Sequence, residues 1–130
     1  MYVTDTHGFV YYSLKKKGRL GPKARRLYER AEAGKSLIYV PSIVLWEVAL
    51  LAVEGDVEIP ERFDHWCRRV EGSSGFAIQA LEWMDVDGAR GLPFPDPYDC
   101  LIAGTALRLA MPLITKDETI CDSGLLDVVW

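Results

Sequence analysis

The sequence predicts a single-domain α/β protein, a three-layer α/β/α sandwich around a central parallel sheet. Short, apolar, β-rich segments alternate with helical segments along the chain, which is the pattern of a parallel sheet covered by helices. The 130 residues match the size of one ordinary domain, and 49% of them are hydrophobic, enough for one core. No internal repeat or low-complexity segment divides the chain. We therefore expect residues 1–130 to form one domain.

The expected elements follow one another as strand and helix. Apolar segments of strand length are residues 1–4, 36–40, 76–81, 113–115 and 126–130. Segments with helical periodicity or helix-start residues are 8–14, 23–33, 43–54, 60–70, 85–90, 97–107 and 117–123, of which 85–90 and 117–123 could instead be turns. Gly34 and Gly55 each follow a helical segment and are suited to end it.

The helix at residues 97–107 has the clearest start signal. Asp96 is a good N-cap residue, and Pro97 suits the first helical position because its missing N–H would have no partner there. Asp99 then falls in the first turn, where the helix dipole favours a negative charge. Capping alone would explain Asp96, whereas Asp99 lies beside the apolar face of the helix. We therefore regard Asp99 as a candidate site residue.

The helix at residues 43–54 is expected to be largely buried, because Glu47 is the only charge between residues 43 and 53. A buried carboxylate is costly unless it is paired or binds a cation. With Ser42 at the N-cap, a capping-box acid would stand at position 45, which is Leu45. Glu47 is therefore expected either to pair with Arg or Lys or to bind a cation.

Four carboxylates are expected at one edge of the sheet. Asp5 follows the first strand, Glu47 lies in the helix after the second, Asp99 opens a helix from the same side, and Asp117 follows the fourth strand. Sites in parallel sheets form at the carboxyl ends of the strands. Asp5 and Asp117 could simply cap the next elements, but four like charges in one pocket need protonation or a bridging cation. Acids without Cys or His ligands favour Mg²⁺ or Mn²⁺.

The net charge of −4 hides a basic block, since nine of the 15 Lys and Arg residues lie between residues 15 and 35, with only two acidic residues among them. Lys15, Lys16, Lys17 and Arg19 open this block. Such a block suggests a polyanion or an acidic partner segment, while the alternative is a solvated helix face. The three cysteines have no spacing typical of zinc sites or a disulfide framework. The absence of a signal-peptide or membrane-spanning pattern favours a cytoplasmic protein.

Four motifs together resemble PIN-domain nucleases, and in particular the VapC toxins of prokaryotic VapBC toxin–antitoxin systems. The motifs are VTDTH at residues 3–7, VPSIVLWEVA at residues 40–49, DPYD at residues 96–99 with the helix that follows, and PLITKD at residues 112–117. Each motif is short, but their order is specific and the resemblance covers essentially the full length. It implies a PIN-like fold.

The resemblance implies a Mg²⁺- or Mn²⁺-dependent endoribonuclease that cuts RNA, such as tRNA or another structured RNA. Asp5 and Asp99 would be the principal metal ligands, Asp117 would complete the site directly or through water, and Glu47 would hold metal or water. Thr6 and Thr115 match the hydroxyl residues that accompany these acids, with Asp96 in support. The expected products carry a 5′-phosphate and a 3′-hydroxyl. A VapB-type antitoxin and a second copy of the chain, in a homodimer, are the implied partners.

Two features depart from the family pattern, and two other functions stay open. Cys100 stands where these toxins commonly carry arginine, and Pro95 where a more polar residue is usual. Neither is an acid ligand, so they affect substrate contacts or packing near the site. A receiver-type Mg²⁺-binding regulatory domain would need paired acids after the first strand, whereas Asp5 stands alone. The remaining alternative is a catalytically silent PIN-like binding module.

Overall fold

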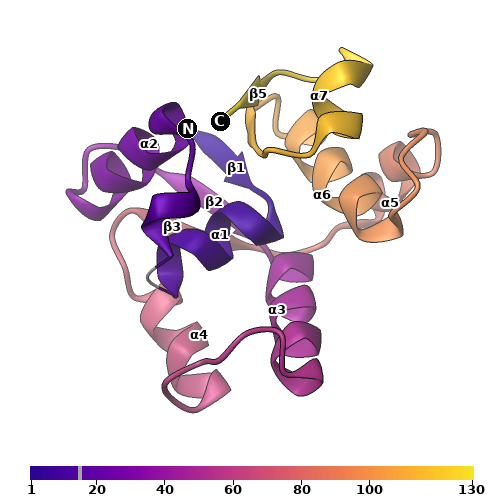
Figure 1. Ribbon diagram of the computed structural model, residues 1–130. Helices are drawn as coiled ribbons and strands as arrows, with labels where there is room; N and C mark the ends of the chain where they lie inside the picture. The colour runs from indigo at the N-terminus through magenta and orange to yellow at the C-terminus, as the bar shows by residue number, and fades with distance from the viewer. Residues whose placement is uncertain (15) are drawn as a thin grey trace.

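A computed structural model describes residues 1–14 and 16–130 and contains one parallel sheet (Figure 1). The described strands are β1 (Tyr2–Thr4), β2 (Ile38–Pro41), β3 (Phe76–Gln79), β4 (Leu113–Ile114) and β5 (Val128–Val129). They are hydrogen-bonded in the order β3-β2-β1-β4-β5, and every pair is parallel. The predicted α/β class with a central parallel sheet is confirmed.

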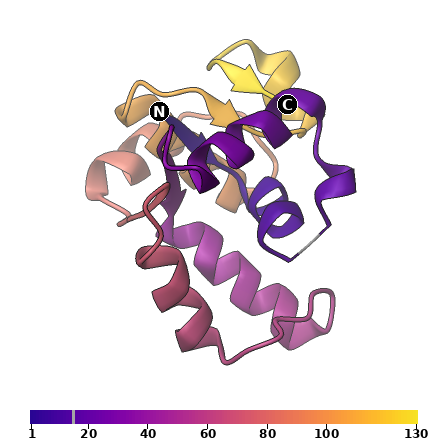
Figure 2. The same ribbon diagram turned by 90° about the vertical axis from the view of Figure 1, so that its left-hand side faces the viewer.

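Helices cover both faces of this sheet. The described helices are α1 (Thr6–Ser13), the 3₁₀ turn η1 (Lys17–Arg19), α2 (Pro22–Glu32), α3 (Ser42–Glu54), α4 (Phe63–Glu71), α5 (Trp83–Ala89), α6 (Pro97–Arg108) and α7 (Glu118–Ser123). Figure 2 shows α1 and α2 on one side of the sheet and α5 and α6 on the other. The segments at 85–90 and 117–123, which could have been turns, are helices over most of their length. No described helix has the length and apolarity needed to cross a membrane.

The strand order creates a switch point between β1 and β4. From β1 the chain moves outward through β2 to β3, and it later returns to the other side of β1 with β4. Crevices at such points, outside the carboxyl ends of the strands, are the usual ligand sites of open parallel sheets. Thr4 pairs with Ile114 in register, and the backbone N–H of Asp5 donates to the carbonyl of Ile114 at 3.1 Å. The residues that leave β1 and β4 are therefore neighbours.

Three aspartates begin helices at this edge. The side chain of Asp5 accepts from the N–H of Gly8 at 2.7 Å, and that of Asp117 accepts from the N–H of Ile120 at 2.9 Å. Asp96 accepts from the N–H of Tyr98 at 2.8 Å, and Pro97 occupies the first turn as predicted. Capping thus accounts for one oxygen of each carboxylate and leaves the second for other contacts.

The expectation that α3 is largely buried is wrong. Only Val44 and Val48 of this helix are buried, whereas Trp46 is 52% exposed and Val53 is 87% exposed. The helix packs one side against α1 and α6, and its carboxyl-terminal half extends beyond the sheet (Figure 1). Ser42 does not cap α3, since its hydroxyl accepts the N–H of Leu81 at 3.1 Å. The mostly apolar α3 therefore exposes apolar side chains, including Trp46 and Val53, on its outer side.

Helices α5 and α6 pack closely against each other around a buried ion pair. The carboxylate of Asp85 is fully buried and accepts from the guanidinium of Arg108, with a second contact at 3.2 Å. Asp85 also accepts from the N–H of Glu82 at 2.9 Å, closing a capping box at the start of α5. A Cβ on Gly104 would lie 2.5 Å from the carbonyl oxygen of Asp85, so this close approach requires glycine in α6.

Candidate active site

The acidic cluster is the group formed by Asp5, Glu47, Asp96, Asp99 and Asp117 at the switch point. Asp5 follows β1, Glu47 lies in the second turn of α3, and Asp117 precedes α7. Asp96 and Asp99 both belong to the start of α6. The negative charges of Asp5, Glu47, Asp96 and Asp117 all raise the pKa of Asp99, so the four predicted acids and Asp96 lie in one region.

Asp5 is the most enclosed member of the acidic cluster, with 6% of its surface exposed. Burial raises its pKa above the usual 3.8, and the negative charge of Asp117 raises it further. Hydrogen bonds from the Thr115 hydroxyl and the Gly8 N–H, and the nearby His7, oppose this rise. Thr115 is itself fully buried, and its hydroxyl also accepts the N–H of Asp117 at 3.1 Å. Thr115 therefore ties together the acids that follow β1 and β4.

Glu47 is held by Thr6. The hydroxyl of Thr6, the first residue of α1, donates to Oε1 of Glu47 at 2.7 Å. Partial burial raises the pKa of Glu47 above the usual 4.5, and the charges of Asp96 and Asp5 add to this effect. Glu47 forms no ion pair with any described Arg or Lys. Of the two roles expected for Glu47, the structural ion pair is thus not found in the described residues.

Asp99 is affected by the charges of all four other members of the acidic cluster. Partial burial is the largest cause, and the charges of Asp96, Asp117, Glu47 and Asp5 follow, so that the pKa of Asp99 rises from 3.8 to about 7. A carboxyl group with this pKa is partly protonated at neutral pH when no cation is present. The protein thus concentrates negative charge at a cost, which is a common property of functional sites.

The acidic cluster offers ligands for a hard cation without forming a finished metal site. All its donors are carboxylate oxygens, the kind that Mg²⁺ and Mn²⁺ prefer. Within residues 1–14 and 16–130, no three acidic, His or Cys side chains are arranged to hold an ion together. The uncapped oxygens of Asp5 and Asp117, with Asp99 and Glu47 beside them, fit such an ion in chemistry and charge. Side chains would have to move to bring three oxygens onto one centre.

His7, Arg19, Lys116 and Trp130 gather around the ring of Tyr11, and we call these five residues the basic and aromatic rim. Lys116 donates to the hydroxyl of Tyr11 at 2.8 Å and lies 4.9 Å from its ring centroid. Arg19 lies over the same ring at 5.8 Å, and Trp130 meets it edge-on. The sequence analysis missed Tyr11 and Lys116, although Lys116 stands between Thr115 and Asp117 in the PLITKD motif.

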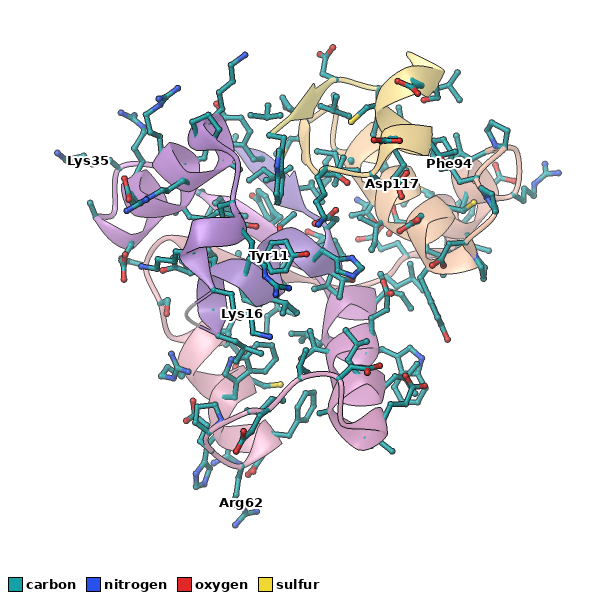
Figure 3. The ribbon with its side chains drawn as sticks, viewed as in Figure 1. Tyr11, Lys16, Lys35, Arg62, Phe94 and Asp117 are labelled. Carbon is teal, nitrogen blue, oxygen red and sulfur yellow. The ribbon has the colours of Figure 1, made fainter. Side chains whose placement is uncertain are left out.

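The four basic residues expected to bind RNA differ in their surroundings. Lys16 is exposed, and Arg19 belongs to the basic and aromatic rim. Lys17 pairs with Glu32 at 3.5 Å and lies over the ring of Tyr12. Lys15 lies outside the described residues. Figure 3 shows Lys35 at the far end of the basic block and Asp117 on the side of α7.

Cys100, at the position usually occupied by arginine, faces the loop before α6. Its thiol lies 3.3 Å from the carbonyl oxygen of Phe94 and 3.8 Å from that of Leu92. The cysteine therefore contacts the loop backbone and does not join the acidic cluster. Cys67, Cys100 and Cys121 are all free thiols.

Comparisons with known proteins identify the fold. The family described as PIN domain matches residues 2–124. A VapBC2 structure from Rickettsia felis, bound to a DNA fragment from its promoter, is 19% identical, with a TM-score of 0.66, covering 98% of this chain and 96% of that one. A toxin–antitoxin complex from Klebsiella pneumoniae is 22% identical, with a TM-score of 0.63, covering 100% of this chain and 97% of that one. A search of curated proteins finds no match.

Proposed function

Because this chain belongs to the PIN domain family, we propose that it is a metal-dependent endoribonuclease, the toxin of a type II toxin–antitoxin system. The observation that carries the proposal is the gathering of Asp5, Glu47, Asp99 and Asp117 at the switch point of the parallel sheet, where burial and the neighbouring carboxylates also raise the pKa of Asp99. A purely structural cluster of acids would be relieved by amide or apolar residues at the same positions. Carboxylates that repel one another are suited to binding a divalent cation, and the bound cation can in turn bind a phosphodiester.

The residues of the acidic cluster take separate roles in this proposal. Asp5 and Asp99 would hold Mg²⁺ or Mn²⁺, with Asp117 completing the site directly or through water. When bound, the ion supplies Lewis acidity for activating water and for stabilising charge on the phosphate. Glu47, whose Oε1 accepts a hydrogen bond from Thr6, would hold metal or the attacking water, and its raised pKa would favour accepting a proton from that water.

Thr115 and Asp96 support this arrangement. Thr115 fixes Asp5 through its hydroxyl, so Asp5 keeps one orientation. Asp96 adds negative charge next to Asp99 and starts the helix that presents it. Lys116 and Tyr11 of the rim, which contact each other, would together contact the phosphate backbone on one side of the scissile bond.

The direct test is cleavage of RNA by the purified protein. Incubation of tRNA or another structured RNA with Mn²⁺ or Mg²⁺ is expected to yield fragments with a 5′-phosphate and a 3′-hydroxyl. Excess EDTA should stop cleavage, and restored Mn²⁺ should return it. Failure to cleave any RNA with either ion would leave the catalytically silent binding module as the better interpretation.

A VapB-type antitoxin is the proposed protein partner. The two similar structures come from a VapBC protein and a toxin–antitoxin complex, and this chain covers at least 96% of each of those chains. A small protein encoded beside this one should co-purify with it and suppress its RNA cleavage. Growth arrest on expression of this chain alone, relieved by the neighbouring protein, would support the same assignment.

The chain is further proposed to form a homodimer through α5 and its surroundings. On this helix Trp83 is 75% exposed, Val86 is 48% exposed and Met84 is 41% exposed. Large apolar residues clustered on a surface mark association sites. We expect Trp83→Glu to convert a dimer into a monomer of 14.6 kDa in analytical ultracentrifugation. Leu125→Glu, an exposed apolar position in another part of the chain, is the matched control, and an unchanged mass for both variants would contradict the proposed interface.

Lys16 and Arg19 are proposed to contact RNA phosphates. Replacing both with Gln should weaken RNA binding and reduce the slope of log Kd against log salt by about 0.7 for each lost phosphate contact. Binding would be measured by fluorescence anisotropy with the Asp99→Asn protein, which avoids cleavage. Arg62→Gln, an exposed basic change on the distant α4 side, is the control. An unchanged salt slope would favour the alternative interpretation, in which the basic block is a solvated helix face.

A further inference from the structure

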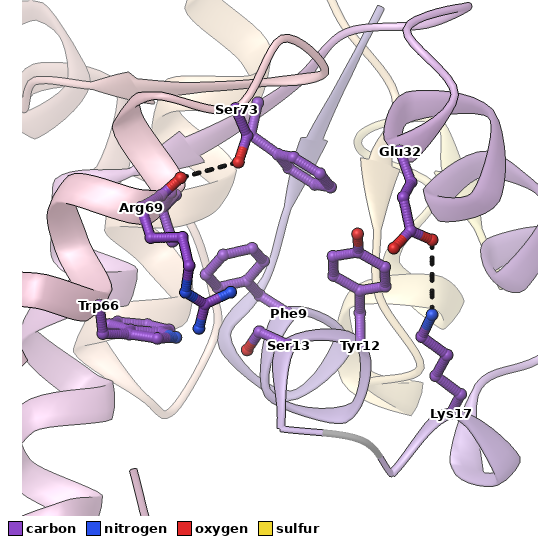
Figure 4. Close-up of a pocket in the computed structure, with 10 residues that line it drawn as sticks. Phe9, Tyr12, Ser13, Lys17, Glu32, Trp66, Arg69 and Ser73 are labelled. Carbon is purple, nitrogen blue, oxygen red and sulfur yellow. Dashed lines mark hydrogen bonds and ion pairs between the residues drawn. The ribbon is translucent and has the colours of Figure 1, made fainter. Parts of the chain in front are cut away.

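Two aromatic side chains beside the acidic cluster differ from those of the core. Phe9, Trp66 and Phe76 line a pocket between α1, α4 and β3 (Figure 4), but they pack on one another and each is at most 7% exposed. That pocket therefore offers a ligand almost no aromatic surface. Trp46, in contrast, is 52% exposed, and its hydrogen-bonding partner Tyr98 is partly exposed. We call these two residues the Trp46–Tyr98 pair.

The Trp46–Tyr98 pair joins the two helices that carry Glu47 and Asp99. Trp46 directly precedes Glu47 in α3, and Tyr98 directly precedes Asp99 in the first turn of α6. The indole N–H of Trp46 donates to the hydroxyl of Tyr98 at 3.4 Å, which holds the indole by its edge. Successive helical residues diverge by about 100° around the axis, so each aromatic side chain leaves its helix beside the neighbouring carboxylate. The pair is therefore an exposed aromatic surface next to the acidic cluster.

The segments that carry the pair contain no basic residue. Neither residues 36–61, which include α3, nor residues 91–107, which include the start of α6, contain Lys or Arg. The carboxylates of the acidic cluster would repel a phosphate or an acidic peptide here, whereas they would not repel an uncharged planar ring. The basic and aromatic rim, with Lys116 and Arg19, supplies the cations that a phosphate backbone needs, and it comes from other elements. The two surfaces thus suit different parts of a nucleotide.

We propose that the Trp46–Tyr98 pair is a platform on which the RNA substrate stacks one unpaired base next to the scissile phosphate. This inference rests on the proposed ribonuclease function and specifies its substrate as RNA that is single-stranded at the cut. Every base has a flat π-face, so stacking on an aromatic side chain tolerates all four bases and is strongest for the larger ones. The phosphate backbone runs from the rim across the acidic cluster to this base. The platform therefore favours purines over pyrimidines at one position of the strand.

The test compares two probes that share a phosphate backbone and differ in their bases. One is a fluorescein-labelled oligoadenylate, and the other is an oligomer of equal length in which hydrogen replaces each base. Binding is measured by fluorescence anisotropy with Mn²⁺, on full-length protein carrying Asp99→Asn so that the probes are not cut. Adding Trp46→Ala should weaken the binding of oligoadenylate about tenfold, because the base loses its stacking partner. The same change should leave the binding of the oligomer without bases unaltered.

Two further variants and a third probe separate stacking from other effects. Trp46→Phe keeps an aromatic face and should recover most of the affinity for oligoadenylate. Val53→Ala is the matched control, because Val53 is an apolar residue of the same helix and is 87% exposed, and it should leave the binding of both oligomers unchanged. Oligouridylate should bind less tightly than oligoadenylate when Trp46 is present, and Trp46→Ala should reduce this difference.

The outcomes distinguish the failure of this proposal from the failure of the proposed function. If RNA is bound and cut but Trp46→Ala has no effect on binding, the platform is wrong and the ribonuclease function stands. Equal losses of affinity for both oligomers also overturn the platform, because the indole would then act without contacting a base. Unchanged RNA binding together with a lower mass in analytical ultracentrifugation would assign Trp46 to a protein contact instead. If protein with Trp46 intact neither binds nor cuts RNA, the proposed function fails and the platform fails with it.

Discussion

Asp99→Asn is expected to reduce RNA cleavage by on the order of a thousandfold or more while leaving the fold intact. The change keeps the size of the side chain but removes the charge at the centre of the acidic cluster, where four other carboxylates act on it. Cleavage would be measured by single-turnover kinetics with Mn²⁺, and folding by circular dichroism. Asp127→Asn, at an exposed position outside the acidic cluster, is the matched control and should leave cleavage unchanged.

The same variant should be more stable than the wild type in metal-free buffer at high pH. Burial and neighbouring charges raise the pKa of folded Asp99 to about 7, above the 3.8 expected when unfolded. Its stabilising contribution is therefore complete below pH 3.8 and is lost as the pH rises through about 7. We expect Asp99→Asn to gain about 1 kcal/mol at pH 8 in EDTA, a value reduced for solvent screening, and much less at pH 5.

Thermal unfolding at both pH values would test this stability difference. Retained cleavage by Asp99→Asn would remove this carboxylate from the active site. A variant that is less stable than the wild type at pH 8 without metal would instead mean that Asp99 makes a favourable structural contact. Mn²⁺ should stabilise the wild type more than the variant, because the ion binds the folded state and requires the charge.

Arg108→Met is expected to lower the free energy of unfolding by about 3–5 kcal/mol. The variant retains length and apolar bulk but leaves the fully buried carboxylate of Asp85 without a cation. Arg90→Met is the matched control in the same helix pair. Arg90 pairs with Asp87 at 2.8 Å, but both side chains are exposed, so the expected loss is only about 0–1 kcal/mol.

Urea unfolding at several pH values would measure the loss of stability in Arg108→Met and show whether it depends on the charge of Asp85. Burial alone would raise the pKa of Asp85, but hydrogen bonds from Arg108 and the Glu82 N–H, and the charge of Arg108, lower it below 3.8. The pair's contribution is thus present above pH 3.8 and is lost as the pH falls through the lowered pKa. Equal losses of unfolding free energy for Arg108→Met and Arg90→Met would show that the buried Asp85–Arg108 pair stabilises the fold no more than the exposed Asp87–Arg90 pair.

The sequence predicted what local chemistry determines. Asp96 and Pro97 predicted the start of α6 correctly, because capping and proline placement depend on neighbouring residues alone. Alternation of apolar strands and helices indicated the parallel sheet, and the chain order placed Asp5 and Asp117 after strands that proved to be neighbours. Whether Asp5, Glu47, Asp99 and Asp117 act as ligands stays a prediction.

Long-range packing was beyond the same reasoning. The exposed side of α3 depends on where the helix passes the edge of the sheet, and Trp46 looks as apolar as the buried Val44 in the sequence. The pairing of Asp85 with Arg108 joins positions 23 residues apart and has no local spacing rule.

Helices α1 and α6 both begin at the switch point, with Asp5 and Asp96 at their N-caps. The amino end of each helix carries a partial positive charge, of roughly half an elementary charge, directed at Asp5 and at Asp96. These dipoles offset part of the repulsion among the carboxylates. If the proposed ion binds, it would therefore bind to carboxylates that the fold has already brought together, and folding would not have to wait for it.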